Sequence, residues 1–367
     1  MEIPESHQRD FRTALLRWFD THKRKLPWRD SADPYRIWLS EVMLQQTRVD
    51  QALPYYTRFL AAFPTVEALA AANLDAVLLL WEGLGYYARA RHLHQAAGIL
   101  TKQYEGMMPS DYGAIRSLPG VGTYTAGAIA SIAFGMPYPA VDGNARRVLA
   151  RCFALRTPTP ATLLRLASQL LDPARPGDFN QALMEAGATV CTPASPRCPA
   201  CPLGGLCAAK ALSRQEDFPA KKVKNPVPHY DIAAGIVLDD EGRLLIQRRA
   251  ERALLGGLWE FPGGKRTAGE TLQQACQREL MEELGITVAV GELLTSVRHA
   301  YTHFRITLYA FRCHITAGIP VSSAGLPVRW VPLNELGQYA FPRANRRVLD
   351  ALGSSQRNKA ATPQYKL

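Results

Sequence analysis

The sequence lacks a long uninterrupted hydrophobic run. Its longest apolar stretch, residues 68–81, is broken by Asn73 and Asp75, whereas a bilayer-spanning helix needs roughly 20 consecutive apolar residues. A membrane-spanning helix is therefore excluded. The sequence also shows no internal repeat, and no secretory segment opens it. We therefore expect a cytoplasmic protein in which structural disulfides are unlikely to form.

Acidic residues are fewer than basic ones. The 367 residues contain 43 Lys and Arg against 32 Asp and Glu, a formal net charge of +11. This excess suits a polyanionic partner such as nucleic acid, although many basic proteins bind none. The length is sufficient for two domains with separate cores.

The sequence pattern divides the chain into four parts. Residues 1–211 show apolar spacing typical of helices, and 212–230 are polar and rich in Pro and Lys, as in a linker. Residues 231–353 contain short β-type runs (232–238, 243–247 and 305–311) interrupted by one strong helix over 271–284. Residues 354–367 form a polar tail that we expect to be disordered. The fold class predicted is multidomain: an all-α domain followed by an α+β domain.

Four of the seven cysteines gather in one segment with the spacing C-x6-C-x2-C-x5-C: Cys191, Cys198, Cys201 and Cys207. Four thiolates can complete a tetrahedral zinc site or an iron–sulfur cluster. Zinc sites favour two CxxC pairs, and only one such pair is present here. Disulfides are disfavoured because the remaining cysteines are scattered singly. The segment predicts a metal centre, with a structural zinc knuckle as the alternative to iron–sulfur.

Residues 118–122, Leu-Pro-Gly-Val-Gly, are the second informative segment. Gly120 and Gly122 permit a tight hairpin with outward-facing backbone N–H groups, and a helix predicted over 123–134 directs its N-terminal dipole to the same place. Such a turn binds a phosphate through amides rather than through side-chain charge. Taken alone, an ordinary helix–helix turn is the commoner explanation.

Glu41 is the candidate proton donor. Ile37, Trp38 and Leu44 lie three or four residues away, which places Glu41 on the apolar stripe of a predicted helix. Burial raises the pKa of a carboxyl, so that it carries a proton at neutral pH. The alternative is a Glu at the edge of the stripe, paired with Arg36 or Arg48.

Asp142 is the complementary carboxylate. It precedes Gly143 and a predicted helix, so we expect it to cap that helix and its pKa to be lowered by the helix N–H groups. One carboxyl with a raised pKa and one with a lowered pKa is the arrangement expected for cleaving an N-glycosidic bond. An ordinary helix cap is the alternative.

Several motifs together resemble the adenine DNA glycosylase family, within the helix-hairpin-helix superfamily that includes endonuclease III. They are residues 26–29 (LPWR), 41–47 (EVMLQQT), 81–87 (WEGLGYY), 118–124 (LPGVGTY), 141–144 (VDGN) and 180–185 (NQALME), together with the cysteine segment. The resemblance covers nearly the whole chain. It implies a structural 4Fe–4S cluster on the four cysteines, with Arg197 in a loop that faces a DNA phosphate.

The resemblance also implies a monofunctional enzyme of base excision repair. Endonuclease III places a Lys nucleophile after its hairpin, whereas this chain has Tyr124. The expected activity is hydrolytic removal of adenine mispaired with 8-oxoguanine or guanine in double-stranded DNA. We expect the protein to act as a monomer on the nucleoid of a bacterial-type cell.

Residue roles follow from the resemblance, position by position. Glu41 protonates adenine, Asp142 stabilises the sugar cation, and Tyr124 and Asn144 hydrogen-bond around it. The pocket that receives the flipped adenine is lined by Arg24, Arg29 and Glu185. The gap that the adenine leaves in the base stack is filled by Gln46, Leu84 and Tyr86. Leu84 and Tyr86 as plain core residues are the alternative.

The C-terminal part contains a complete Nudix box, G-x5-E-x7-REL-x-EE-x-GI, over residues 264–286. Glu279, Glu282 and Glu283 share one helix face and can bind Mg²⁺. In the family this domain resembles a Nudix hydrolase but reads 8-oxoguanine, a role the resemblance gives here to Tyr301, Thr302 and His303. Inherited structure without turnover is the alternative to an active box.

Three other function classes remain open at this level. A lyase would nick the abasic product without heat or alkali. A nucleotide pyrophosphohydrolase would need divalent metal and a free nucleotide. A lesion-binding protein without catalysis would leave adenine in place, and the Glu41–Asp142 pair disfavours it.

Overall fold

The computed structural model describes residues 2–221, 226–301 and 303–360. They form two compact units. The helical unit falls within 1–71 and 92–224, and the C-terminal unit within 72–91 and 225–367. The change of unit between 224 and 225 falls within the predicted linker 212–230, and residues 72–91 group with the C-terminal unit.

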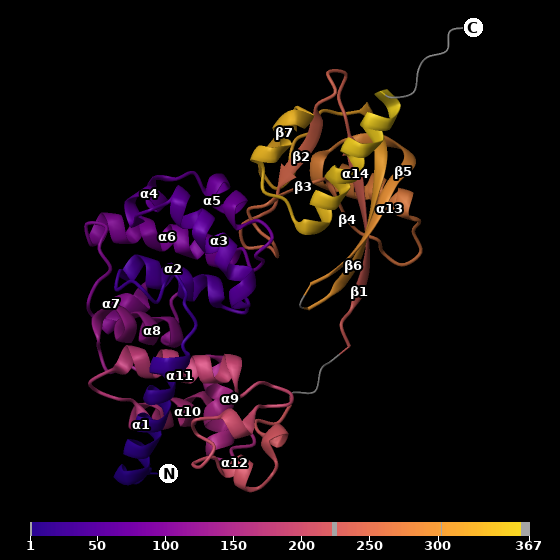
Figure 1. The fold of residues 1–367 in the computed structure, drawn as a ribbon. Helices are drawn as coiled ribbons and strands as arrows, with labels where there is room; N and C mark the ends of the chain where they lie inside the picture. The colour runs from indigo at the N-terminus through magenta and orange to yellow at the C-terminus, as the bar shows by residue number, and fades with distance from the viewer. Residues whose placement is uncertain (1, 222–225, 302, 361–367) are drawn as a thin grey trace. The chain divides into compact units, whose positions relative to one another are not determined.

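The first part of the chain is helical, as predicted (Figure 1). Its helices are α1 (Glu5–His22), α2 (Pro34–Leu44), α3 (Val49–Ala62), α4 (Val66–Ala71), α5 (Leu74–Trp81), α6 (Ala88–Gln103), α7 (Tyr112–Ser117), α8 (Thr123–Phe134), α9 (Gly143–Cys152), α10 (Pro160–Leu170), α11 (Pro176–Thr189) and α12 (Ala208–Ala211). Two 3₁₀ turns follow α11, η1 (Cys198–Ala200) and η2 (Gln215–Asp217).

Several helices begin at a short polar side chain that accepts a backbone N–H. Asp33 caps α2, Asp111 caps α7 and Asp142 caps α9, and Thr159 does the same for α10. Such caps satisfy otherwise unpaired donors in the first turn and are worth about 1 kcal/mol each. The start of α9 is thus set by Asp142, as the sequence predicted.

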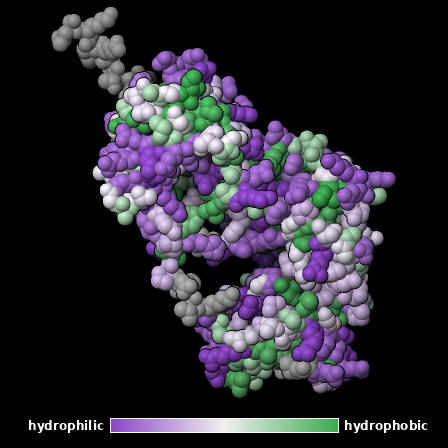
Figure 2. Space-filling model, turned by 180° about the vertical axis from the view of Figure 1, so that it is seen from behind, coloured by the Kyte–Doolittle hydropathy of each residue, from purple (hydrophilic) through white to green (hydrophobic). Residues whose placement is uncertain are grey.

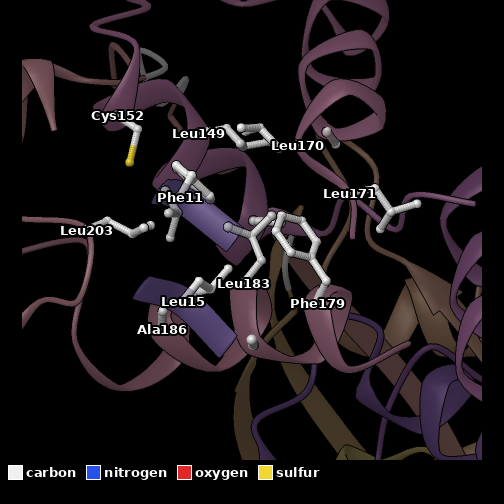
Figure 3. Packing of buried hydrophobic residues seen from close by; sticks show 14 of the residues in the cluster. Phe11, Leu15, Leu149, Cys152, Leu170, Leu171, Phe179, Leu183, Ala186 and Leu203 are labelled. Atoms are coloured by element: carbon white, nitrogen blue, oxygen red, sulfur yellow. The ribbon is translucent and has the colours of Figure 1, made fainter. Parts of the chain in front are cut away.

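One core of the helical unit packs α1 against α9, α10 and α11 (Figure 3). Phe11 and Leu15 from α1 meet Phe179 and Leu183 from α11, and all four side chains are essentially inaccessible. Leu203, from the cysteine segment, is buried in the same cluster. The cysteine segment is therefore attached to the core that carries α9 and α11.

The C-terminal domain contains two sheets. The strands are β1 (His229–Val237), β2 (Leu244–Arg248), β3 (Trp259–Glu260), β4 (Gly263–Lys265), β5 (Thr287–Ala300), β6 (Arg305–Ala317) and β7 (Val328–Val331). The four-stranded sheet has the order β4-β1-β6-β5, in which β1 and β6 are parallel and the other pairs antiparallel. The three-stranded sheet, β3-β2-β7, is antiparallel.

Helices cover both faces of the four-stranded sheet. Ala233 and Val237 of β1 pack with α13 (Leu272–Leu284), while Ala234 and Ile236 pack in the cluster that includes α14 (Arg343–Ala360). This alternation follows from the two-residue period of a strand. The α+β class is confirmed, and the four-stranded sheet lies between two helices. A 3₁₀ turn, η3 (Leu333–Gln338), lies between β7 and α14 in the sequence.

One predicted range differs from the structure. The tail was expected to be disordered from Ser354, but α14 continues through Ala360. Residues 361–367, and 222–225 of the predicted linker, lie outside the described residues. The predicted helix over 271–284 is confirmed: Thr271 is its N-cap in a capping box with Gln274.

The described helices include none that is long and apolar enough to cross a membrane. The face seen in Figure 2 is mostly hydrophilic, with scattered apolar side chains. Scattered surface apolar groups are ordinary in folded proteins and carry no further meaning.

Candidate active site

Glu41 lies in α2 and is buried, with 5% of its surface exposed. Burial raises its pKa to about 7; the hydrogen bond from Tyr124 opposes this shift and the charge of Asp142 adds to it. The Tyr124 hydroxyl donates to Oε2 of Glu41 at 2.5 Å. The predicted apolar surroundings are confirmed, and the alternative of an ion pair with Arg48 is not what the structure shows.

Asp142 caps α9, and both of its oxygens accept hydrogen bonds. The Ala145 backbone N–H donates to Oδ1 at 2.7 Å, and the Asn144 amide donates to Oδ2 at 2.8 Å. The expected lowering of its pKa is nevertheless wrong, because burial of the carboxyl outweighs these donors and the pKa is raised. Helix capping was predictable from the local sequence, whereas the enclosure depends on tertiary packing.

Tyr124, in the first turn of α8, is hydrogen-bonded to Glu41 and is influenced by the charge of Asp142. Its hydroxyl reaches Glu41 and lies 3.2 Å from Sδ of Met184. Its pKa is raised, first by burial and then by the charges of Glu41 and Asp142. Three predicted site residues from α2, α8 and the α9 cap thus share one environment.

Glu185, on α11, is a buried carboxylate held by two arginines. Arg24 donates from Nε and Nη2 at 2.6 and 2.8 Å, and Arg29 donates from Nη2 at 2.8 Å. Burial favours a higher pKa, but these hydrogen bonds bring the pKa of Glu185 down to about 2. The three residues predicted to line the adenine pocket are therefore assembled and fully ion-paired.

The hairpin before α8 has the predicted geometry. Gly120 has φ +75°, and a Cβ there would lie 2.7 Å from Cβ of His92. Gly122 caps α8 in extended conformation, with open space where a Cβ would be. Only Gly120 therefore needs to be glycine for backbone and steric reasons, while Gly122 leaves the helix N-terminus uncovered.

The residues predicted to enter the base stack are placed differently from one another. Gln46 and Tyr86 are exposed and have φ values of 57° and 49°, a conformation that costs roughly 1–3 kcal/mol in a non-glycine residue. Leu84 is buried, with 4% exposed. Leu84 therefore packs in the interior, as the alternative for this residue proposed. Gln46 and Tyr86 are the two accessible side chains of the set.

The four cysteines of the C-x6-C-x2-C-x5-C segment line one small cavity. Arg151 of α9 lies beside it, donating from Nη1 to the Sγ of Cys191 at 3.3 Å, and Lys210 and Arg197 also border it. Within the described residues, no group of three or more His, Cys, Asp or Glu side chains could hold a single metal ion. The exposed Arg197 donates to the backbone oxygen of Thr189.

A cavity of the C-terminal domain is lined by Tyr301 and His303. The Tyr301 ring stacks on Phe304 with centroids 4.7 Å apart and meets His299 edge-on at 4.5 Å. His303 is exposed, and Thr302 lies outside the described residues. The described part of the predicted loop thus presents an aromatic ring and an imidazole at one cavity.

The three glutamates of the Nudix box do not form one group. Arg278 donates from Nη1 to Glu279 at 2.9 Å and to Glu282 at 3.0 Å. Glu283 accepts instead from Gln247 at 2.6 Å and from the Gly263 backbone at 3.1 Å. All three lie in α13 at positions i, i+3 and i+4, and Mg²⁺ binding by them stays a prediction.

The family described as the HhH-GPD superfamily base excision DNA repair protein matches residues 39–173, and the NUDIX domain family matches 233–351. Adenine DNA glycosylase from Homo sapiens is 38% identical over 92% of this chain and 73% of its own length. The Mus musculus enzyme is 37% identical, over 92% and 77%. The chain belongs to the adenine DNA glycosylase family.

Solved structures agree with this glycosylase assignment. A thermostable thymine-DNA glycosylase superposes with TM-score 0.53 at 29% identity, covering 56% of this chain and 98% of its own. A trapped endonuclease III–DNA intermediate (TM-score 0.51, 23% identity, 57% and 99%) shows the same fold. The protein is thus a DNA glycosylase whose helical domain has the endonuclease III fold.

Two glycosylase residues that the sequence did not single out support the Asp142 loop. Asn180, buried in α11, accepts from the Ala140 N–H at 3.0 Å and donates to the Tyr138 oxygen at 2.9 Å. Arg147 donates to Oδ1 of Asn144 at 2.8 Å. The polar Asn180 within an apolar helix pattern was the available signal, because a buried amide must find partners.

Proposed function

We propose that this enzyme removes adenine from A:8-oxoguanine and A:G mispairs in double-stranded DNA by hydrolysis. The observation that supports this proposal is the buried Glu41, which accepts a hydrogen bond from Tyr124, is influenced by the charge of Asp142 and has a pKa of about 7. A carboxyl with this pKa exists partly protonated at neutral pH and can donate its proton to a leaving base.

The two carboxyls divide the work. Glu41 protonates the flipped adenine, which weakens the N-glycosidic bond. Asp142, fixed by the Ala145 N–H and Asn144, stabilises the oxocarbenium-like sugar that develops. The residue after the hairpin is Tyr124, not an amine, so no Schiff base forms there and the enzyme is monofunctional.

The extruded adenine enters near Glu185. The Arg24–Glu185–Arg29 arrangement offers fixed hydrogen-bond partners and a net charge of +1, because two guanidinium groups share one carboxylate whose two oxygens both accept from them. Gln46 and Tyr86 are the exposed groups that fill the space the base leaves, which offsets the few kcal/mol of extrusion. Gly120 and Gly122 present backbone amides to a phosphate.

Tyr301, Thr302 and His303 read the opposite 8-oxoguanine. The stacked Tyr301–Phe304 pair supplies an aromatic surface for a base, and the exposed His303 supplies a polar edge. Discrimination between 8-oxoguanine and guanine is then a difference in affinity created by these contacts.

The four cysteines hold a 4Fe–4S cluster. They line one cavity, and their spacing contains only one CxxC pair, whereas tetrahedral zinc sites favour two. Arg151, Arg197 and Lys210 border the cavity and complement the negative charge of four thiolates. The cluster is structural and fixes the segment between α11 and α12.

A single-turnover excision assay tests the main proposal, with adenine placed opposite 8-oxoguanine or opposite guanine. The wild-type protein should release adenine from both and prefer 8-oxoguanine. Tyr301→Ala with His303→Ala should reduce that preference while leaving A:G cleavage intact. Point variants are better than removal of the whole domain, since residues 72–91 pack in the C-terminal unit. An unchanged preference would place recognition elsewhere.

The cluster has its own test. Anaerobically purified protein should be brown and contain iron and sulfide, and Cys198→Ala should lower the folded yield more than the activity of the protein that survives. Cys276→Ala is the matched control, because Cys276 is a buried cysteine of the C-terminal unit, away from the four-residue pattern. Stoichiometric zinc in place of iron would contradict the assignment.

A second candidate function is a weak divalent-metal site with nucleotide pyrophosphohydrolase activity on 8-oxo-dGTP. The favouring observation is that Glu283 and Glu260 line the same cavity as Tyr301, next to the complete box. Binding of Mg²⁺ requires Arg278 to release Glu279 and Glu282. Mn²⁺ titration of the full protein against Glu282→Gln with Glu283→Gln tests it; identical titrations would mean that the box is inherited structure.

A further inference from the structure

Residues 72–91 make polar contacts in the C-terminal unit that the adenine site does not use. Asp75 of α5 lies 3.2 Å from Nη2 of Arg248, and Arg91 donates to the backbone oxygen of Gly256. The third contact comes from Glu82, at the C-terminal end of α5. It directly precedes the loop that contains the exposed Tyr86.

Both carboxylate oxygens of Glu82 are engaged. Arg346 of α14 donates from Nε to Oε1 at 3.0 Å and from Nη2 to Oε2 at 2.9 Å. The Phe341 backbone N–H adds a third bond to Oε1 at 3.2 Å. The two side chains are largely shielded, with 21% and 29% exposed. A bidentate pair of this kind fixes orientation as well as distance.

Arg346 is itself held in place. Its Nη2 also donates to the backbone oxygen of Tyr339 at 2.8 Å, and its guanidinium lies 5.2 Å from the centroid of the Phe341 ring. The partner of Glu82 is therefore a fixed group of the C-terminal domain and not a mobile surface arginine.

The loop that follows Glu82 has an unusual backbone. Gly83, Gly85 and Tyr86 all have positive φ, at 95°, 79° and 49°. A non-glycine residue persists in this region only where its surroundings determine it. The Gly85 oxygen accepts from Nε1 of Trp81 at 3.0 Å and from Nη2 of Arg89 at 3.1 Å. Glu82 anchors the start of the same loop.

We propose that Glu82 and Arg346 form a positioning pair, through which the C-terminal domain holds the Gly83–Tyr86 loop in the shape that presents Tyr86 to the DNA stack. This inference rests on the proposed function. Glu82 reaches neither the adenine nor the opposite base, so it acts through the loop. Because a displacement of about 1 Å can cost 10²-fold in rate, loss of the pair should slow excision roughly 10- to 100-fold.

The experiment measures single-turnover release of adenine opposite 8-oxoguanine by the full-length protein. Glu82→Ala and Arg346→Ala should each slow it, and the double variant should be no slower than either single variant, because the two act as one unit. Duplexes with 2-aminopurine at the target position should show less fluorescence increase with Glu82→Ala. A structural role alone would not change this base-extrusion signal.

Two further variants keep the test decisive. Asp75→Ala removes another ion pair of the same segment and should leave both readouts near wild type. On a Tyr86→Ala background, Glu82→Ala should add no further loss. Equal losses in Asp75→Ala and Glu82→Ala, or an unchanged fluorescence signal in Glu82→Ala, would overturn the pair's positioning role. A wild-type protein that releases no adenine would instead defeat the proposed function.

Discussion

Glu41 in the helical unit and Glu260 in the C-terminal domain are both enclosed, and burial raises the pKa of each to about 7. Their partners differ. Glu41 accepts a neutral hydroxyl from Tyr124, whereas Glu260 is ion-paired with Arg249. The comparison shows that a pKa of about 7 can arise whether burial is opposed by a neutral hydrogen-bond donor or by an ion pair. Only Glu41 has a neutral partner, as the proton donor of the proposed mechanism requires.

Glu185 completes the comparison within the helical unit. It is as buried as Glu41, yet its pKa is about 2, because Arg24 and Arg29 supply three charged hydrogen bonds. Desolvation acts on every buried carboxyl, and the number of guanidinium donors decides whether the proton stays. In the proposed mechanism the same residue type therefore serves as an acid at position 41 and as a fixed anion at position 185.

The largest effect that this comparison predicts is on catalysis. Glu41→Gln should lower single-turnover adenine release by about 10²–10⁴-fold, the usual value of general acid catalysis, while duplex binding remains. Glu5→Gln, an exposed change in the first turn of α1, is the control. A near-wild-type rate in Glu41→Gln would remove Glu41 from the mechanism.

The next effect is on stability. Glu185→Gln should lower the free energy of unfolding by about 3 kcal/mol, the low end for breaking a buried pair, because Arg29 is 11% exposed and Arg24, at 38%, is partly compensated by solvent. Asp178→Asn breaks the exposed pair with Arg175 and should cost less than about 1 kcal/mol. Urea unfolding at neutral pH measures both. Equal costs would show that burial of Glu185 contributes nothing to the pair.

The free energy of unfolding should depend on pH with opposite signs for Glu41 and Glu185, two carboxyl groups of the helical unit. The pKa of Glu41 is higher in the folded than in the unfolded state, so its contribution to stability falls as pH rises from about 4.5 to about 7. Glu41→Gln should therefore raise the unfolding free energy above pH 7, by up to about 3 kcal/mol. Glu185 acts oppositely: its stabilisation is present above pH 4.5 and is lost as pH falls towards 2. Unfolding curves across this range check both signs.

The smallest effect is expected at Glu260. Its pKa is raised like that of Glu41, but Glu260→Gln also deprives Arg249 of its ion-pair partner. The two consequences oppose each other, so the unfolding free energy above pH 7 should change by less than about 1 kcal/mol. An increase in the unfolding free energy as large as that expected for Glu41→Gln would mean that the ion pair with Arg249 does not contribute to stability.

Local sequence predicted the helices and caps well. The Asp142 cap before Gly143, the helix predicted over 271–284 and the Gly120 hairpin each form as expected. These features depend on a few neighbouring residues, because capping and turn conformations are satisfied within one turn of chain. The strand over residues 287–300 was missed, because its partners are distant in sequence and half of it is exposed.

The sequence by itself determined the motifs and their chemistry: four cysteines at cluster spacing, a Glu on an apolar helix face and a complete Nudix box. Only the tertiary structure decided which of the ionisable groups are charged and which of them are ion-paired. It raised the pKa of Asp142 against the capping effect, paired Glu185 with two arginines some 160 residues away, and placed Arg278 between box glutamates. The physical reason is that desolvation and ion pairing depend on which distant side chains are brought together, and a local sequence pattern does not encode those neighbours.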